Sequence, residues 1–271
     1  MQDSSLLEAY FQRIRYSGSR EPTPDTLHKI TMAHASAIPF ENLDVLLGLP
    51  VRIDIEAIVE KLVTRGRGGY CFEQNGLLFH VLGRLGFTVK PLSARVRLQR
   101  PREFTPPRTH VFIQVEIDKQ AWLTDVGVGG ASLTAALRLD IGAEQETPHE
   151  TRRIIQDGGR FFHQALFDTG WADVCEFTLE EMPPIDQELA NWFTSAHPKS
   201  HFKDRLIVAR AGGRGTRYTL VNREFSVRHP GHPAISRILE SPRQLTQVLR
   251  ESFGLDFPEG TEFQSPGLDW T

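Results

Sequence analysis

The sequence predicts an α+β protein built from three consecutive sections, and two changes in hydrophobic periodicity support this. Residues 1–84 carry apolar side chains at helical spacing. Residues 85–190 switch to an alternation of apolar and polar side chains, which is typical of β-strands. Residues 191–271 combine short alternating runs with one more helical pattern, so this last section is expected to be mixed α/β.

Four helices are expected in the first section, each with a recognisable start. Ser5 and Glu8 have the spacing of a capping box. Thr23 is followed by a proline, as at a capped helix with proline in its first turn. Asp54 precedes a clear amphipathic stripe, and the fourth helix starts near Cys71.

The second and third sections yield strands and one further helix. The expected strands of the second section cover 94–98, 109–117 and 121–128, whereas 140–160 is polar and cannot be assigned. In the third section, a loop containing His197 and Pro198 starts at Asn191, and strands follow at 206–209, 218–221 and 225–227. Ser241 opens the last helix.

Composition excludes several classes of protein. The 271 residues are 39% hydrophobic and 24% charged, as in an ordinary globular protein. A net charge of −3 argues against a nucleic-acid binder, and two cysteines rule out a disulfide scaffold or a four-cysteine zinc site. The opening lacks the apolar core of a signal peptide, and no run approaches the ~18 apolar residues of a membrane span. We therefore expect a cytoplasmic protein that binds neither membrane nor nucleic acid.

Cys71 is the first candidate for chemistry, because it follows a glycine pair at the expected start of a helix. A helix N-terminus stabilises negative charge and so favours the thiolate, which is the nucleophilic form of cysteine. The alternative is that Cys71 is a small buried hydrophobic residue, which is the commoner role of a free cysteine.

The hairpin at 109–128 supplies a base and a group to orient it. Pairing the apolar face of the first strand with that of the second places odd-numbered residues opposite even-numbered ones. This register puts His110 and Asp125 on one face, directly opposite or two residues apart. The alternative is that this face is simply the solvated side of the hairpin. The order Cys, His, Asp is nevertheless that of a thiol enzyme.

Other histidines do not suggest a metal site. His197 and His201 are spaced i, i+4, but Pro198 interrupts any helix that would bring them to one face. No metal is therefore expected.

Four segments together resemble the arylamine N-acetyltransferase family of prokaryotic type. They are IPFENLDVLLG at 38–48, RGGYCFEQN at 67–75, the spacing from His110 to a TDVGVGG ending at 124–130, and NWFTSAHPKSHF at 191–202. The resemblance implies a cysteine-protease-like fold with a helical bundle (1–84), a β-barrel (85–190) and an α/β lid (191–271). It also carries a catalytic triad over onto Cys71, His110 and Asp125.

The resemblance further implies which residues surround the triad. Thr109, Gly127 and Gly129 would line the cofactor cleft. Phe40 and Phe202 would lie near the acceptor, although ordinary core packing is an equal alternative for these two aromatic residues. The chain departs from the family at Val128, where an aromatic residue is more usual, and this bears on the shape of the acceptor pocket.

The reaction implied by the resemblance is a two-step acetyl transfer. Acetyl-CoA would acetylate the cysteine, and an arylamine or hydrazine would then take the acetyl group; N-hydroxyarylamines are an open further class of acceptor. No permanently bound cofactor is expected, and the protein would act as a monomer or weak homo-oligomer. A cysteine-triad hydrolase or transglutaminase-like enzyme is the first alternative, and a non-catalytic interaction module is the second.

Overall fold

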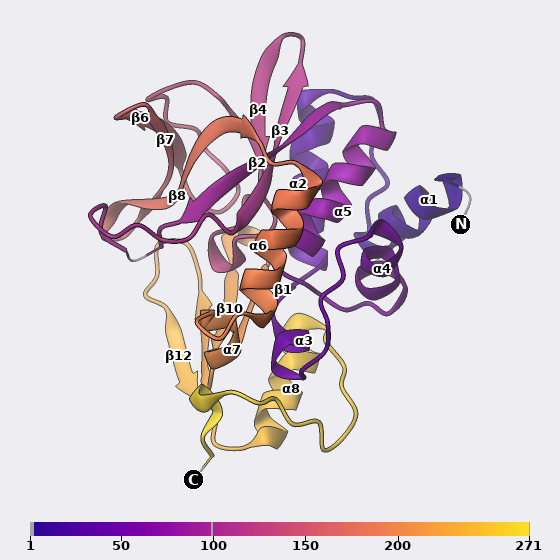
Figure 1. Cartoon of the computed structure of the whole chain (residues 1–271), viewed down its shortest axis with the longest axis vertical. Helices are drawn as coiled ribbons and strands as arrows, with labels where there is room; N and C mark the ends of the chain where they lie inside the picture. The colour runs from indigo at the N-terminus through magenta and orange to yellow at the C-terminus, as the bar shows by residue number, and fades with distance from the viewer. Residues whose placement is uncertain (1–2, 99, 271) are drawn as a thin grey trace.

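The computed structural model describes residues 3–98 and 100–270. Its first section is helical and lies on the right in Figure 1, in indigo to purple. The elements there are α1 (Asp3–Arg13), α2 (Pro24–Ala37), α3 (Leu43–Leu46), α4 (Ile55–Val59), the π-helical turn η1 (Glu60–Thr64) and α5 (Cys71–Arg84).

Three of the four expected helix starts are confirmed. The Thr23 hydroxyl accepts the N–H of Thr26, the Asp54 carboxylate accepts that of Ala57, and α5 begins at Cys71. The capping-box prediction for Ser5 and Glu8 is wrong, because α1 already includes Asp3 and both residues lie inside the helix.

The second section forms a seven-stranded antiparallel sheet that curls into a nearly closed barrel (Figure 1). The strand order is β5-β4-β3-β2-β8-β7-β6. The strands are β2 (Thr88–Val96), β3 (His110–Ile117), β4 (Gln120–Thr124), β5 (Leu137–Arg138), β6 (Arg152–Asp157), β7 (Arg160–Phe167) and β8 (Gly170–Glu181). The unassigned stretch 140–160 therefore contains β6, and bridges from Ile141 and Gln145 pair with this strand.

A second sheet joins the two ends of the sequence, with the order β1-β9-β10-β11-β12. Its strands are β1 (Phe40–Glu41), β9 (Ile207–Ala211), β10 (Arg217–Val221), β11 (Glu224–Arg228) and β12 (Ile235–Ile238). Helix α8 (Pro242–Phe253) packs on this sheet, and the short elements nearby are α7 (His201–Asp204), η3 (Gly213–Gly215) and η4 (Pro266–Leu268). The three strands and the helix expected in the third section are confirmed. Strand β12 was missed, because all four of its residues are exposed and no alternation of burial marks it.

The prediction that a loop starts at Asn191 is wrong. Helix α6 (Pro184–Ala196) runs through this residue and ends before Pro198, which cannot continue a helix. The expected boundary at 190/191 accordingly falls inside α6, which runs down the middle of the view in Figure 1.

Both faces of the β3–β4 hairpin are covered. Ile113, Val115 and Ile117 pack against the helices of the first section. Phe112 and Leu123 face the interior of the barrel. The alternative of a solvated hairpin face is thus excluded for this part of the hairpin. Among the described residues, no helix combines the length and the apolar character needed to cross a bilayer.

Candidate active site

Helix α5 begins at Cys71, and the segment just before it runs unusually close to the backbone at Pro39. A Cβ on Gly68 would lie 2.1 Å from the backbone oxygen of Pro39, so no other residue fits there without a shift of the backbone. The Glu73 carboxylate accepts the N–H of Tyr70 at 3.0 Å and closes the first turn. Cys71 itself is buried, with 4% of its surface exposed.

The start of α5 rests on five charged side chains that are largely buried, which we call the helix-start cluster: Glu41, Asp44, Lys61, Arg67 and Glu73. Arg67 bridges Glu41 and Asp44, with both N–O distances 2.8 Å. Lys61 bridges Asp44 at 2.7 Å and Glu73 at 2.6 Å. Three carboxylates therefore share two cations directly beneath the turn that carries Cys71.

The hairpin register predicted from the sequence is confirmed, but the second strand is shorter than the expected 121–128 and ends at Thr124. Gln114 pairs with Leu123 and Ile113 with Thr124, so odd numbers lie opposite even ones. The turn residues Asp118 and Lys119 both have positive φ, as in the two-residue turns that keep this register. His110 and Asp125 consequently lie on the barrel-facing side, where the His110 Nε2 donates to the Asp125 Oδ2 at 2.7 Å.

The Asp125 carboxylate is held by two further donors that sequence reasoning missed. The Asn75 Nδ2 donates to Asp125 Oδ1 at 2.9 Å, and the N–H of Gly127 donates to the same oxygen at 2.9 Å. Asn75 also accepts the N–H of Val126 at 3.0 Å. Asn75 lies one helical turn after Cys71, and this i, i+4 spacing was the available signal. One helix therefore positions both the sulfur and the carboxylate.

Electrostatics favour a charged His110–Asp125 pair. Burial by itself would lower the pKa of His110, but the Asp125 carboxylate and the Cys71 sulfur outweigh it and raise the pKa to about 10. Burial would raise the pKa of Asp125, yet His110 and the hydrogen bonds from Asn75 and Gly127 lower it below its ordinary value. The imidazole therefore carries a proton over the neutral pH range.

Cys71 lies beside this pair and beside the predicted cleft residues. Its sulfur is within hydrogen-bonding reach of His110, and since Nε2 is bonded to Asp125, Nδ1 is left for Cys71. The sulfur also contacts the carbonyl oxygen of Thr109 at 3.7 Å. A Cβ on Gly127 would lie 2.6 Å from the Cys71 Cα, so the loop after Asp125 runs directly against the cysteine. The structure brings Cys71, His110, Asp125, Thr109 and Gly127 together.

The aromatic residues predicted for the acceptor side also lie together. The rings of Phe40 and Phe202 are 6.1 Å apart, and that of Tyr70 is 5.6 Å from Phe202. A Cβ on Gly129 would lie 3.6 Å from the Phe40 ring. Val128 does not join this group, because it packs among the barrel residues.

One group of side chains in the described part of the chain has the spacing of metal ligands: His110, Asp125 and Cys175, whose ligand atoms lie within 4.8 Å of one another. His110 and Asp125 are already hydrogen-bonded to each other. Burial raises the pKa of Cys175 well above its ordinary value, so the thiolate that a metal requires is disfavoured. The chemistry of this donor set fits a hydrogen-bonded pair better than a metal centre.

Comparison with known proteins agrees with the predicted family and fold class. Residues 23–261 match the family model described as N-acetyltransferase. The chain is 40% identical over 250 residues to the arylamine N-acetyltransferase of Escherichia coli, which covers 92% of this chain and 89% of that protein.

Solved structures give the same result. The arylamine N-acetyltransferase from Salmonella typhimurium superposes with a TM-score of 0.88 at 37% identity, covering 97% of this chain and 96% of that one. The Mycobacterium marinum arylamine N-acetyltransferase in complex with CoA gives a TM-score of 0.88 at 38% identity, covering 92% of each chain. The chain therefore belongs to the arylamine N-acetyltransferase family.

Proposed function

We propose that this protein transfers the acetyl group of acetyl-CoA to arylamines and hydrazines through an acetyl-Cys71 intermediate. The observation that carries the proposal is the position of Cys71 at the start of α5, within reach of a His110 side chain that Asp125 holds. The names of its relatives support the substrate class, since they include an N-hydroxyarylamine O-acetyltransferase and a CoA complex. We extend the proposal to N-hydroxyarylamines on that basis.

In the first step, Cys71 is the nucleophile. Protonated His110 stabilises the thiolate, which attacks the carbonyl carbon of acetyl-CoA and forms the new C–S bond. The N–H groups of Cys71 and its neighbour Phe72 occupy the first helical positions, have no intrahelical acceptor, and are suited to stabilise the oxyanion. The bond to the CoA sulfur then breaks, and His110 gives its proton to that sulfur.

In the second step, the amine attacks the carbonyl carbon of acetyl-Cys71. His110, now neutral, takes a proton from the amine nitrogen, and the Cys71 thiolate leaves as the amide forms. Asp125 keeps the imidazole in one orientation and stabilises its charged form in both half-reactions. The resting thiolate–imidazolium pair is restored, and no permanently bound cofactor takes part.

We assign the surrounding residues by their contacts with Cys71 and with one another. Thr109, Gly127 and Gly129 would line the cleft for acetyl-CoA, and Phe40 and Phe202 would contact the arylamine ring. Val128 packs in the barrel, so it would shape the acceptor pocket only from behind, through its two neighbouring glycines.

We further propose that the enzyme acts in the cytoplasm as a monomer or weak homo-oligomer. Both cysteines are free thiols, as is typical of reducing compartments. The side chains of Cys71, His110 and Asp125 meet within a single chain, which is compatible with a monomeric enzyme.

The proposal is tested by incubating the protein with acetyl-CoA in the absence of an acceptor. Mass spectrometry should find one acetyl group, located on the peptide that contains Cys71. Addition of an aniline should remove this group and release an equal amount of the acetylated amine.

Two variants serve as controls for this experiment. Cys71→Ser should take up no acetyl group, whereas Cys175→Ala should be labelled like the wild type. Unlabelled wild-type protein, with free acetate accumulating, would instead indicate a hydrolase. Unlabelled protein whose two cysteines react equally slowly with iodoacetamide would indicate a non-catalytic module.

A further inference from the structure

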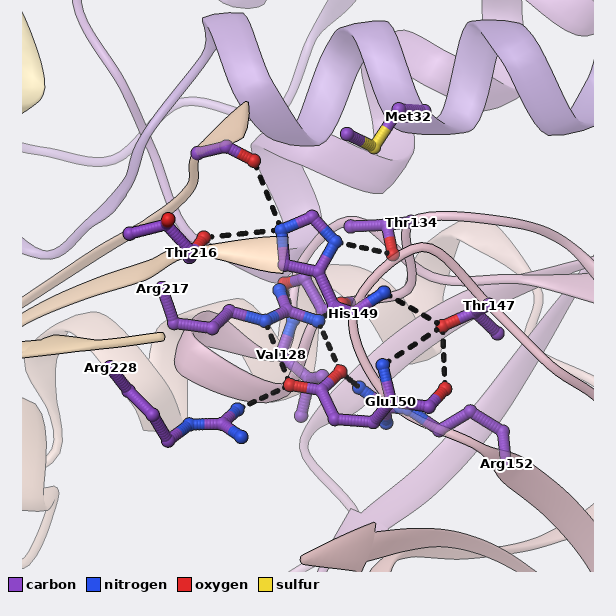
Figure 2. A network of polar contacts seen from close by, with 12 residues as sticks. Met32, Val128, Thr134, Thr147, His149, Glu150, Arg152, Thr216, Arg217 and Arg228 are labelled. Atoms are coloured by element: carbon purple, nitrogen blue, oxygen red, sulfur yellow. Dashed lines mark hydrogen bonds and ion pairs between the residues drawn. The ribbon is translucent and has the colours of Figure 1, made fainter. Parts of the chain in front are cut away.

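A buried charged cluster lies where the barrel meets the second sheet, remote in sequence from the proposed triad (Figure 2). We call Glu150, Arg152, Arg217 and Arg228 the barrel–lid cluster. The Glu150 carboxylate accepts from Arg217 at 2.7 and 3.1 Å and from Arg152 at 2.8 Å, and Arg228 also pairs with it. Glu150, Arg152 and Arg217 are each at most 6% exposed.

Arg217 differs from the other two arginines in one contact. Its Nη2 also donates to the carbonyl oxygen of Ser132 at 2.9 Å. Among the described residues, the Arg228 side chain donates hydrogen bonds to Glu150 alone. Its guanidinium also lies over the ring of Phe167. We call residues 125–133 the active-site loop. Of the two arginines on the second sheet, Arg217 connects the cluster to this loop and Arg228 does not.

Hydrogen bonds close the active-site loop on itself near its C-terminal end, at Ser132 and Leu133. The Ser132 N–H donates to Gly129 O at 3.0 Å, and the Ser132 Oγ accepts the N–H of Val128 at 3.1 Å. The N–H of Leu133 donates to the backbone oxygen of Asp125 at 2.7 Å. A displacement of Ser132 would therefore be passed to the glycines that contact Cys71 and Phe40.

His149 adds a second connection next to the first. Figure 2 shows its ring between Thr134 and Thr216, and its Nε2 donates to the carbonyl oxygens of Thr216 and Gly212, each at 3.1 Å. Its Nδ1 accepts from the Thr134 hydroxyl at 3.0 Å. Burial together with Arg217 lowers the pKa of His149 to about 4, so the ring is neutral near pH 7 and its Nδ1 can accept from Thr134. The chain just after the active-site loop is thus also tied to the second sheet.

We infer that Arg217 is a positioning residue for acetyl transfer, which holds the active-site loop at its distance from Cys71 by bridging Glu150 and the Ser132 carbonyl. The guanidinium suits this role because it donates in several fixed directions, so that bonds to Glu150 fix its direction toward Ser132. Small displacements of groups around a nucleophile lower catalysis strongly. The inference rests on the proposed function at Cys71.

The test compares Arg217→Gln with the matched control Arg228→Gln. The two arginines are cross-strand partners and bind the same carboxylate, but only Arg217 contacts the loop. We expect a larger loss of thermal stability in Arg217→Gln, because Arg217 is buried and makes three hydrogen bonds, whereas Arg228 is partly exposed and makes one. The kcat values are therefore compared at a temperature at which both variants are fully folded. The kcat for acetyl transfer should fall about 10-fold or more in Arg217→Gln and less than about 3-fold in Arg228→Gln. The KM for acetyl-CoA should change less than kcat in both.

A second readout separates positioning from damage to the triad. The rate and pH profile of Cys71 alkylation by iodoacetamide should be nearly unchanged in both variants, because Asn75 and His110 still hold Asp125. Equal losses of kcat in the two variants, or a loss of alkylation that parallels the loss of kcat, would overturn the inference.

Arg217→Lys keeps the test valid if Arg217→Gln does not fold. Lysine retains the positive charge beside Glu150 but lacks the planar fork that bridges this carboxylate and the Ser132 carbonyl. A lowered kcat with normal alkylation supports the inference, and a normal kcat contradicts it. The wild-type rate is measured in parallel: if the wild type transfers no acetyl group, the proposed function fails, and with it the inference.

Discussion

The two charged clusters beside the proposed active site are built with opposite imbalances. The helix-start cluster has three carboxylates for two cations, whereas the barrel–lid cluster has three cations for one carboxylate. Both are largely buried, and both support a segment that contacts Cys71. The first lies under the start of α5, and the second holds the end of the active-site loop.

The imbalance decides how each cluster responds to protons. Burial and the nearby Glu41 raise the pKa of Glu73 to about 7, although Lys61 opposes this. Burial acts in the same direction on Glu150, but Arg217 and Arg152 overcome it and hold the pKa of Glu150 far below its ordinary value. A buried carboxylate is therefore a titrating group in the first cluster and a permanent charge in the second.

Replacement of the single carboxylate in the barrel–lid cluster should have the largest effect. Glu150→Gln leaves three arginines without a counter-charge in a buried site, and the free energy of unfolding should fall by about 3–5 kcal/mol. Urea denaturation at pH 7 measures this loss. The exposed Glu144→Gln, six residues earlier, is the control and should change stability by less than about 0.5 kcal/mol. A loss for Glu150→Gln as small as this would show that the cluster contributes nothing.

The corresponding substitution in the helix-start cluster, Glu73→Gln, should raise the free energy of unfolding at high pH instead of lowering it. The pKa of Glu73 in the folded protein is above its ordinary value of 4.5, so the folded state binds this proton more tightly. The stability that this proton provides is complete below about pH 4.5 and is lost as the pH rises through about 7. Glutamine resembles the protonated acid and can still accept the N–H of Tyr70.

Glu73→Gln should therefore match the wild type near pH 4.5 and exceed its free energy of unfolding at pH 8, by on the order of 2 kcal/mol. Urea denaturation of both proteins across this pH range measures the difference. Parallel curves for the two proteins would refute the titration of Glu73, and a large loss at pH 8 would show that its charge stabilises the fold.

The smallest effect should be that of salt on the barrel–lid cluster. Buried ion pairs are screened much less than exposed ones. The stability difference between Glu150→Gln and the wild type should change by less than about 0.5 kcal/mol when sodium chloride is raised from low to near-molar concentration. A difference that shrinks steadily with salt would mean that solvent reaches these charges.

Local patterns were enough to place several residues of the candidate site. The start of α5 at Cys71 follows from a glycine pair and helical periodicity, which act over a few residues. The shared face of His110 and Asp125 follows from strand alternation and a two-residue turn, because a slip of one residue would reverse the apolar face. Motif resemblance extended this to the family, which the comparisons confirm.

Other contacts had no local signal. Glu150 falls in the stretch that could not be assigned, and two of its partners, Arg217 and Arg228, lie more than sixty residues away on β10 and β11. The pairing of β1 with β9 likewise joins Phe40 to Ala209. The orientation of Val128 also had no local signal, because whether it faces the acceptor side or the barrel depends on how the active-site loop turns.

The sequence by itself determined the order of the helical, β and mixed sections, the register of the hairpin and the residue types able to form a thiol triad. These depend on periodicity and on short-range geometry, which a linear pattern records. Only the tertiary structure decided that α5 brings Asn75 to Asp125, and that Arg217 connects Glu150 to the active-site loop. Such contacts depend on which buried polar groups meet after packing, because each must find a partner there, wherever in the chain that partner lies.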